Sequence, residues 1–466
     1  MRMATRSYHV RDLRFGPETA YEDGVLTVCR EELAAMLSRS AAFKKLDIRI
    51  ACPGEAKRIT NILEIVPPRV KTVSGRRSYF PGILNTQFQA GFGKHNTLQG
   101  CTVMEVGQRP GLLCGVVDMQ GPAAALTPFS KTCNLCLVAE PATGVASSEY
   151  CMALKKAGLR TAVYLAESTM DRHPDNIEIF DLEERSSVAE GLPRVGYLFQ
   201  LYSGNNARHS FLYGARYCGY YPTFLHPNEI LDGALVCGHY SAPFALKIPT
   251  YTLLNHPIVL ELYRRHGREI DFRGVIIAPE PTTMEEIQRT AIMSSSLLEH
   301  CLGVQGVIIT KEGGGHTSVN LMACCDACEA SNISTVLMDY EYLGTEGDGD
   351  LPVLCTTPNA DAMVSIGNIE KMVELGPMEN VIGGERAPEM DVDMATGGKV
   401  PIGMIPEAIS QLGGGRPKSE TKNHGEPKQN SDRSEPASRR AVDMLLKKMS
   451  GIPWESEIQL PKSTWW

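Results

Sequence analysis

The sequence predicts an α/β protein in which a β-rich N-terminal lobe precedes an α/β domain with a mainly parallel sheet. In residues 1–144, Pro and Gly punctuate short apolar runs, a pattern typical of a sandwich or barrel-like β domain. In residues 145–412, short all-apolar strands alternate with helices, as in βαβ units. At 466 residues, with 43% hydrophobic and 21% charged residues, the chain is long enough for two or three globular domains.

Within the N-terminal lobe we expect several strands and one short helix. The helix is predicted over residues 30–38, and residues 46–50 alternate with the period of two expected of a half-buried strand. Further strands are predicted at residues 24–28, 100–106 and 111–117.

In the second domain, helical and strand patterns alternate. We expect strands at residues 194–199, 274–278, 306–310 and 334–338, and helices at 148–158, 257–266, 284–301 and 320–331. Ligands of such sheets bind beyond the carboxyl ends of the strands, so loops at those ends are candidates for function.

The C-terminal region is predicted to be a linker followed by a docking element. Residues 413–440 form the linker, because residues 416–440 contain no aliphatic or aromatic side chain beyond Ala437. Residues 441–466 form a short helix and an aromatic tail that carries Trp454, Trp465 and Trp466. This tail docks either on a partner or on the core of its own chain.

The formal net charge of −8 argues against nucleic acid or an anionic membrane as the main partner. No segment reaches the roughly 18 consecutive apolar residues that span a bilayer, and the first residues lack the apolar region of a secretory signal. We therefore expect a cytoplasmic protein whose 14 cysteines stay reduced.

Cys133 and Cys136 form a Cys-x-x-Cys pair. Such a pair can be a redox dithiol or half of a zinc site, but neither a matching second half nor a His-x-x-x-His accompanies it, so no metal site is expected. Two readings remain open, a catalytic redox pair or two thiols packed along a strand.

A glycine-rich loop follows the strand predicted at 306–310. It contains Gly313, Gly314, Gly315 and His316 and precedes a helix, where backbone amides can bind an anionic group of a substrate. The loop matches neither the dinucleotide fingerprint nor the P-loop pattern, and it can also be a plain turn.

The run of residues 232–241 is hydrophobic and then stops abruptly at Cys237, Gly238, His239, Tyr240 and Ser241. A Cys or Ser on a glycine-led turn can attack a substrate or the preceding peptide carbonyl, with His239 as its base. Cys237, His239 and Ser241 are therefore candidate catalytic residues. We expect any self-cleavage to occur before Ser241 and not before Cys237.

Several strings along the chain form a pattern, and they lie at residues 13–16, 24–26, 127–132, 137–141, 229–234, 249–251 and 262–267. Together they resemble the proprotein subunit of component B of the glycine/sarcosine/betaine reductases, and the similarity runs from about residue 8 to residue 412. In that family the proprotein cuts itself at a cysteine shortly after the Asp-Gly-Ala run, and the new N-terminus becomes a pyruvoyl group whose carbonyl captures the amine of the substrate. A partner subunit carrying a selenol or thiol then displaces the amine, and a disulfide is the eventual electron acceptor.

The resemblance thus implies a reductase subunit that acts on a small amine-containing metabolite with a thiol- or selenol-bearing partner subunit. The sequence departs from the family pattern at the cleavage site, because Gly238-His239-Tyr240 stands where the cysteine is expected. Either Ser241 takes the place of that cysteine or Cys237 is the nucleophile. In the alternative reading the chain stays intact, carries no pyruvoyl group, and is a non-catalytic scaffold or regulatory subunit.

Overall fold

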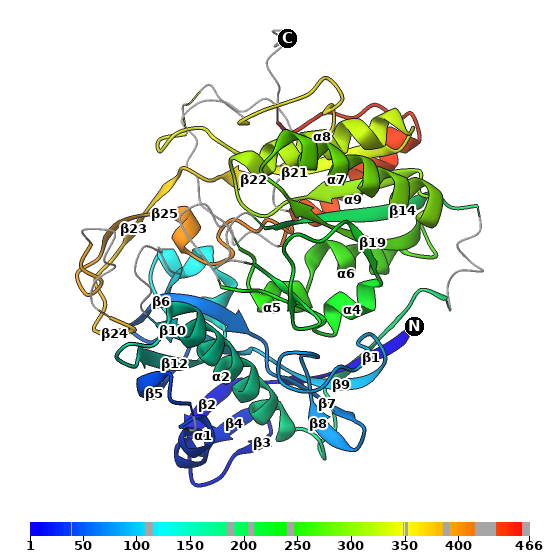
Figure 1. Cartoon of the computed structure of the whole chain (residues 1–466). Coiled ribbons are helices and arrows are strands. Elements are labelled where there is room, and N and C mark those ends of the chain that lie inside the picture. The colour runs from blue at the N-terminus through cyan, green and yellow to red at the C-terminus, as the bar shows by residue number, and fades with distance from the viewer. Residues whose placement is uncertain are drawn as a thin grey trace.

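The computed structural model of the chain describes residues 1–38, 40–107, 115–183, 191–203, 209–239, 247–347, 349, 353–384, 392–414 and 435–458. Two lobes lie one above the other in the view of Figure 1, with the N-terminal lobe below and the α/β lobe above. Within these ranges the helices are all too short or too polar to cross a bilayer.

The N-terminal lobe is built on two mixed sheets. Its strands are β1 (Arg2–His9), β5 (Phe43–Ala51), β6 (Lys57–Val66), β7 (Arg69–Val73), β8 (Arg76–Ser78), β9 (Gly93–Gln99), β10 (Cys101–Gly107), β11 (Gly115–Asp118), β12 (Cys133–Pro141) and β13 (Asn176–Asp181). One sheet has the order β13-β1-β9-β7-β8, and the other has the order β11-β6-β10-β12-β5. Helix α2 (Ser147–Glu167) packs on β6, β7 and β10, and its buried face closes the core of the lobe.

Smaller elements complete this lobe. They are a three-stranded sheet of β2 (Asp12–Phe15), β3 (Ala20–Glu22) and β4 (Val25–Val28), helix α1 (Arg30–Leu37), and the 3-10 turns η1 (Ala123–Leu126) and η2 (Pro128–Lys131).

A six-stranded sheet forms the centre of the α/β lobe. Its strands are β14 (Arg194–Tyr202), β17 (Thr223–Leu225), β19 (Asp271–Glu280), β20 (Gly306–Thr310), β21 (Ser334–Glu341) and β22 (Met363–Asn368). The order is β17-β19-β14-β20-β21-β22, and all neighbours are parallel except the edge strand β17. Numbered along the chain, the parallel strands lie in the order 2-1-3-4-5, so the winding reverses between β14 and β20. The predicted α/β class is confirmed.

Helices cover both faces of this sheet, which explains why the central residues of its strands are mostly apolar. Helix α7 (Met284–Ser296), the π-helical turn η3 (Leu297–Leu302) and α8 (His316–Ala330) lie on one face, where they pack around Val307 and Ile309. Helices α6 (Pro257–Arg265) and α9 (Ala437–Met449) lie on the other face, around Ile308. This is a doubly wound, three-layer arrangement.

Helix α9 shows, for the described part of the C-terminal region, whether it docks on a partner or on the core of its own chain. Val442 and Leu445 are fully buried in the core that contains Ile308 and Val336, so the helix folds back on its own sheet. After the helix, the indole N–H of Trp454 donates to the carbonyl of Asp361 (3.3 Å). Trp465, Trp466 and most of the predicted linker lie outside the described residues.

The lobes do not divide where the sequence suggested. Helix α2 and strand β13 both follow residue 144, yet they complete the N-terminal lobe. The chain also returns to this lobe after β22, because β24 (Asn380–Ile382) pairs with β6. On either side of β24 in the sequence, β23 (Met372–Leu375) and β25 (Gly398–Pro401) pair with each other, and the turn η4 (Ile402–Met404) follows. The buried Arg58 holds the returning segment against this lobe, because it forms an ion pair with Asp118 (2.6 Å) and donates a hydrogen bond to the Met394 carbonyl (2.6 Å).

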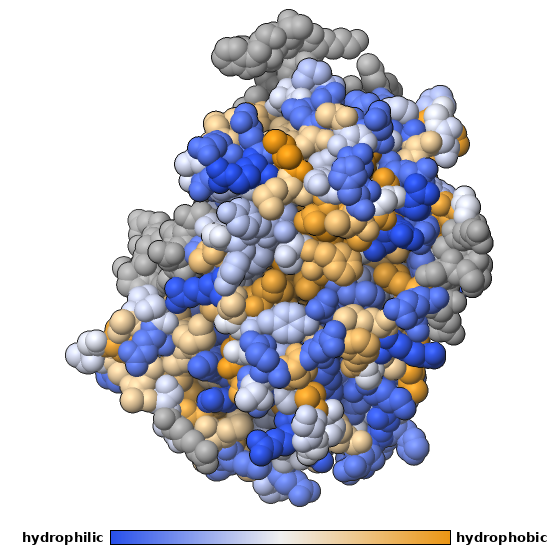
Figure 2. All heavy atoms as spheres, turned by 45° about the vertical axis from the view of Figure 1, so that its right-hand side comes forward, coloured by the Kyte–Doolittle hydropathy of each residue, from blue (hydrophilic) through white to orange (hydrophobic). Residues whose placement is uncertain are grey.

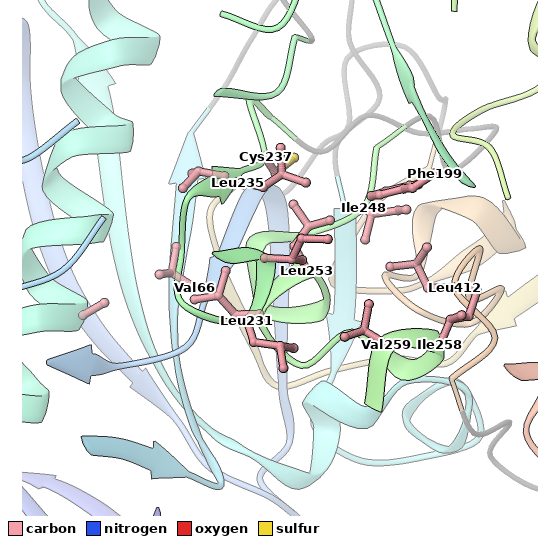
Figure 3. Close-up of a cluster of buried hydrophobic side chains, with 14 of the residues drawn as sticks. Val66, Phe199, Leu231, Leu235, Cys237, Ile248, Leu253, Ile258, Val259 and Leu412 are labelled. Carbon is pink, nitrogen blue, oxygen red and sulfur yellow. The ribbon is translucent and has the colours of Figure 1, made fainter. Parts of the chain in front are cut away.

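The segment between β14 and β19 connects the two lobes. It contains a small sheet of β15 (Phe211–Leu212), β16 (Ala215–Arg216) and β18 (Leu235–Val236). Helix α4 (Pro227–Leu231) precedes β18 in the sequence, and helix α5 (Thr250–Leu254) follows it. Figure 3 shows Val66 of the N-terminal lobe, Phe199 of β14 and Cys237 in one cluster of apolar side chains. On the face in Figure 2, apolar atoms gather in a band across the middle of the molecule. One hydrophobic core therefore continues from one lobe into the other.

Candidate functional site

Cys237 lies in this connecting segment, directly after β18, and is completely buried. Its backbone N–H donates to the hydroxyl of Thr250 (3.0 Å). Burial raises the pKa of the Cys237 thiol well above its ordinary value, so the thiol is protonated at neutral pH and is a poor nucleophile. Ser241 lies outside the described residues, as do its neighbours from 240 to 246.

Three charged side chains of the N-terminal lobe meet beside this segment, and all three are buried. Glu64 projects from β6, Glu105 from β10 and Lys155 from α2. The Lys155 ammonium lies 2.5 Å from Glu64 Oε2 and 3.6 Å from Glu105 Oε2. Burial alone would lower the pKa of Lys155, but the charges of Glu105 and Glu64 outweigh it and raise that pKa. Lys155 is therefore a fixed positive charge held by two carboxyl groups.

Glu105 is the less satisfied of these two carboxyl groups. Neither of its oxygens accepts a hydrogen bond from a described residue, and burial raises its pKa to about 8. Gly158 makes room for it on α2, because a Cβ there would come within 2.3 Å of Glu105 Oε1. The Glu105 carboxyl is thus largely protonated at neutral pH, and a small change of pH or of nearby charge alters its protonation.

His239 faces this carboxyl group from the connecting segment. Its side chain is almost completely buried, and its Nε2 lies 3.6 Å from Glu105 Oε2. Imidazole and carboxyl groups at this separation can share a proton through a small movement or a bridging water. The structure therefore brings a sequence-predicted residue together with a proton-exchanging group that we did not predict.

Glu64 connects the same cluster to Cys237. It accepts hydrogen bonds from the backbone N–H of Thr250 (2.9 Å) and from its hydroxyl (2.8 Å), while Thr250 in turn accepts from the Cys237 N–H. Because Thr250 begins α5, the N-terminal lobe fixes both the start of that helix and the end of β18. The backbone on either side of residues 240–246 is thereby held in place.

Lys247 marks the other end of the undescribed stretch and is bound by the α/β lobe. Its ammonium forms a buried ion pair with Glu312 and donates to the Ser210 hydroxyl (2.8 Å). Glu312 also accepts from the backbone N–H groups of Tyr202 (2.9 Å) and Ile248 (3.1 Å). The two ends of residues 237–247 are thus anchored to different lobes.

Glu312 belongs to a row of buried charges at the carboxyl ends of the parallel strands. Glu280 ends β19, Lys311 follows β20, and Asp339 lies near the end of β21, where it pairs with Lys311 (2.8 Å). Burial and then the charge of Glu312 raise the pKa of Glu280 well above its ordinary value. Glu280 Oε2 and Asp339 Oδ2 have no hydrogen-bond partner among the described residues. Because the sheet reverses its winding between β14 and β20, this edge is where doubly wound sheets bind ligands.

The glycine-rich loop lies at the same edge, between β20 and α8, as predicted. Gly313 and Gly315 have φ values of +73° and +87°, which favour glycine. The Gly313 N–H donates to Gln411 (2.8 Å), and its carbonyl accepts from Lys311 (2.7 Å). A Cβ on Gly314 would come within 2.6 Å of the Tyr342 hydroxyl. The loop is therefore tied closely to the sheet edge.

His316 begins α8 at the end of this loop. Burial lowers the pKa of its imidazole, so the side chain is neutral at pH 7. The substrate-binding role of Gly313, Gly314, Gly315 and His316 stays a prediction, and the loop's position at the reversal point is consistent with it.

The structure does not bring Cys133 and Cys136 together. Both lie in β12, and residues three apart in a strand point to opposite faces. Accordingly, Cys133 belongs to the core under β2, whereas Cys136 packs with Ile59 and Phe129 on the other side of the sheet. Burial raises the pKa of Cys136 to about 12. A disulfide between the two residues would require the strand to unfold.

The sequence contained a signal for the charged residues that we missed. Glu64 and Glu105 each interrupt an apolar run, at residues 62–66 and 103–106, and Lys311 and Glu312 directly follow an apolar strand. A charge inside a buried strand is costly unless it is paired, so such positions indicate partners elsewhere in the fold. The sequence alone did not indicate which charges meet.

Comparison with known proteins identifies the family of the chain. A sequence model of the family described as glycine/sarcosine/betaine reductase component B subunits matches residues 1–405. The chain belongs to this family. The match includes the N-terminal lobe, all six strands of the α/β sheet, the connecting segment and the glycine-rich loop, and it ends before α9. No solved structure matches the chain.

Individual members of the reductase component B family are similar over most of their length. The chain is 34% identical over 386 residues to the sarcosine reductase complex component B subunit alpha of Peptoclostridium acidaminophilum, covering 82% of this chain and 89% of that relative. The same identity and coverage hold for the glycine reductase complex component B subunits alpha and beta of Acetoanaerobium sticklandii. A betaine reductase complex component B subunit alpha from Peptoclostridium acidaminophilum is 32% identical, with 82% of this chain and 88% of the relative covered.

Proposed function

We propose that this chain is a catalytic subunit of a reductase complex that cleaves a bond to nitrogen in a small amine-containing metabolite. In this proposal a partner subunit supplies the attacking thiol or selenol, and a disulfide is the eventual electron acceptor. The names of the relatives support a place in a multisubunit complex. The observation that carries the proposal is the buried pair of His239 and Glu105, which can exchange a proton beside a segment held by both lobes.

We further propose that the chain divides before Ser241. Two relatives bear the names of an alpha and a beta subunit in one chain, which supports a division of the precursor. The Ser241 hydroxyl would attack the carbonyl of Tyr240, and the peptide nitrogen would leave it, giving an ester. Elimination then breaks the Cβ–O bond of residue 241, which leaves a carboxylate on Tyr240 and a dehydroalanine at the new N-terminus. Hydrolysis of this N-terminus consumes one water and releases one ammonia. The product is a pyruvoyl group at position 241.

His239 and Glu105 have defined roles in this proposal. His239 accepts the proton of the Ser241 hydroxyl as it attacks and returns it to the peptide nitrogen as the old bond breaks, while the Glu105 carboxyl group faces the imidazole at 3.6 Å. The burial of Cys237 and the raised pKa of its thiol argue against this residue as the nucleophile. When present, the pyruvoyl carbonyl supplies an electrophile for the substrate amine. In this proposal the imidazole of His239 would hold such a group by donating a hydrogen bond to its carbonyl oxygen.

The proposed substrate site lies at the carboxyl ends of the parallel strands. Glu280 and Asp339 carry unpartnered carboxyl oxygens there, which can accept hydrogen bonds from an ammonium group. The backbone amides of Gly314 and Gly315 can bind an anionic group. Lys247 connects this edge to the proposed cleavage segment through Glu312.

Intact mass spectrometry of the purified full chain, combined with N-terminal analysis, tests the division. We expect two fragments, the second beginning at residue 241 with a blocked N-terminus that phenylhydrazine labels. Ser241→Ala should leave the chain whole, whereas the matched control Cys237→Ala should still be cut. A wild-type chain of full mass would overturn the proposed division and favour a non-catalytic scaffold or regulatory subunit. A fragment that begins elsewhere would exclude Ser241.

A further inference from the structure

A second pair of cysteines faces each other across two strands of the N-terminal lobe. Cys52 directly follows β5, and Cys133 begins β12. These strands are antiparallel, with Asn134 opposite Ala51 and Leu135 opposite Ile50. One step further along this register, Cys133 stands opposite Cys52.

The backbone hydrogen bonds show which kind of antiparallel pair this is. The Cys133 N–H donates away from β5, to the carbonyl of Gly100 (2.8 Å). The Cys52 N–H also points elsewhere, to Glu55 Oε2 (2.6 Å). Residues opposite each other without mutual backbone bonds form the closer type of pair, with Cα atoms about 4.5 Å apart. This separation lies within the range that a disulfide spans.

Both thiols lie on the same face of the sheet. Cys52 Sγ is 3.7 Å from the Leu13 carbonyl, and Cys133 Sγ is 4.0 Å from the Arg11 carbonyl, so both lie under the segment that enters β2. The two cysteines also pack in the same core. Every cysteine that the structure describes is a free thiol.

The two thiols differ in exposure and acidity. Cys52 is partly exposed, whereas Cys133 is buried. A hydrogen bond from the Cys133 thiol lowers the pKa of Cys52, and the same bond, together with burial, raises the pKa of Cys133. An accessible, more acidic thiol in front of a buried one is the arrangement of an attacking and a resolving cysteine.

We propose that Cys52 and Cys133 form a redox-active dithiol that reacts with low-molecular-weight disulfides. The Cys52 thiolate attacks the disulfide and releases one thiol, leaving a mixed disulfide on Cys52. Cys133 then loses its proton, attacks the Cys52 sulfur and displaces the second thiol. Two protein thiols are oxidised to a disulfide, and the external disulfide is reduced to two thiols. This site is independent of the chemistry proposed at Ser241.

Cys101 and Cys136 are the neighbouring thiols that could compete for this role. Cys101 lies opposite Cys133 on the parallel strand β10, but it is fully buried and burial raises its pKa. Cys136 points to the other face of β12. Neither has the partial exposure of Cys52.

The test is to treat the reduced full chain with oxidised glutathione, alkylate the remaining thiols and map the tryptic peptides by mass spectrometry. Trypsin separates the two cysteines into peptides 50–57 and 132–155. We expect these peptides to become cross-linked, the thiol titre to fall by two per chain, and dithiothreitol to reverse both changes. A wild-type chain without this cross-link would overturn the proposal.

Matched variants assign the bond within the longer peptide. Cys136→Ala should keep the cross-link, whereas Cys133→Ala should trap glutathione on Cys52, because the resolving thiol is gone. Cys52→Ala should abolish both cross-link and adduct. Loss of the cross-link in Cys136→Ala, or no adduct in a folded Cys133→Ala, would contradict the pairing. If Cys133→Ala does not fold, the wild-type and Cys136→Ala maps decide, with fragment ions that distinguish Cys133 from Cys151 in the same peptide.

Discussion

The two buried charge clusters on either side of residues 237–247 differ in how completely their carboxyl groups are satisfied. In the α/β lobe, Glu312 accepts from Lys247 and from two backbone N–H groups. In the N-terminal lobe, Glu105 accepts no hydrogen bond from a described residue and has a pKa of about 8. A fully bonded carboxylate anchors the chain, because changing its protonation would break several bonds. An unsatisfied one beside His239 is free to exchange a proton.

Burial and charge alone therefore do not identify a reactive group. Both carboxyl groups are completely buried, and both lie near a lysine. Only the number of donors distinguishes them. We therefore assign the anchoring of the connecting segment to Glu312 and proton exchange to Glu105.

The largest expected effect is on the proposed cleavage. His239→Gln removes the proposed base for Ser241, and we expect the rate of fragment appearance to fall about 10²–10⁴-fold, the usual contribution of a general base. The rate is measured by gel electrophoresis after synthesis in a cell-free system. The exposed His173, changed to Gln in the same way, is the control and should leave the rate unchanged. An unaltered rate in His239→Gln would place proton exchange elsewhere.

The anchoring role of Glu312 predicts a large loss of stability when its partner is removed. Lys247→Met leaves a buried carboxylate without its counter-charge, which typically costs about 3–5 kcal/mol. We expect this decrease in the free energy of unfolding, measured by denaturant titration. The same substitution at Lys57, whose pair with Glu55 is partly exposed, should cost less than about 1 kcal/mol. Equal costs at both sites would show that the buried pair is no anchor.

The sequence predicted the order of elements well because apolar periodicity is a local property. The predicted strand at residues 306–310 coincides with β20, and the predicted helix at 257–266 ends within one residue of α6. The boundaries between the lobes were harder to predict from the sequence. Pairing of β13 with β1, and of β24 with β6, joins segments that are far apart in the chain, and no local pattern reports such contacts.

The candidate site shows the same limit. The sequence identified His239 and the glycine-rich loop, because their neighbours are unusual. It could not identify Glu105 as the partner of His239, since that contact joins residues 134 positions apart and depends on how the lobes pack. For the cysteines, spacing suggested Cys136 as the partner of Cys133, whereas strand register places Cys52 opposite it. Spacing identifies partners on a turn, but in a strand the neighbour across the sheet is closer.

The raised pKa of Glu105 predicts a pH dependence of stability. A carboxyl group whose pKa is higher in the folded than in the unfolded state stabilises the fold most at low pH, and this contribution is lost as pH rises through the folded pKa. Between about pH 5 and 8, Glu105 should lower the free energy of unfolding by about 1.4 kcal/mol per pH unit. Glu105→Gln, which mimics the neutral acid, should remove this part of the slope. Denaturant titrations at several pH values check it, and identical slopes in both proteins would contradict the assignment.

The smallest expected effect tests whether Glu105 is held rigidly against α2. Gly158→Ala should gain up to about 1 kcal/mol from helix propensity, but its Cβ would lie within 2.3 Å of Glu105 Oε1, and such overpacking typically costs about 1–3 kcal/mol. If the buried carboxyl group cannot move, the cost of overpacking exceeds the gain in helix propensity, and the free energy of unfolding falls by about 1–2 kcal/mol. The same substitution in a Glu105→Ala background should be stabilising, because the clash is absent there. A double-mutant cycle by denaturant titration measures the difference. Stabilisation in both backgrounds would show that the Glu105 side chain moves freely, and its proton exchange would then not depend on the position that the fold gives it.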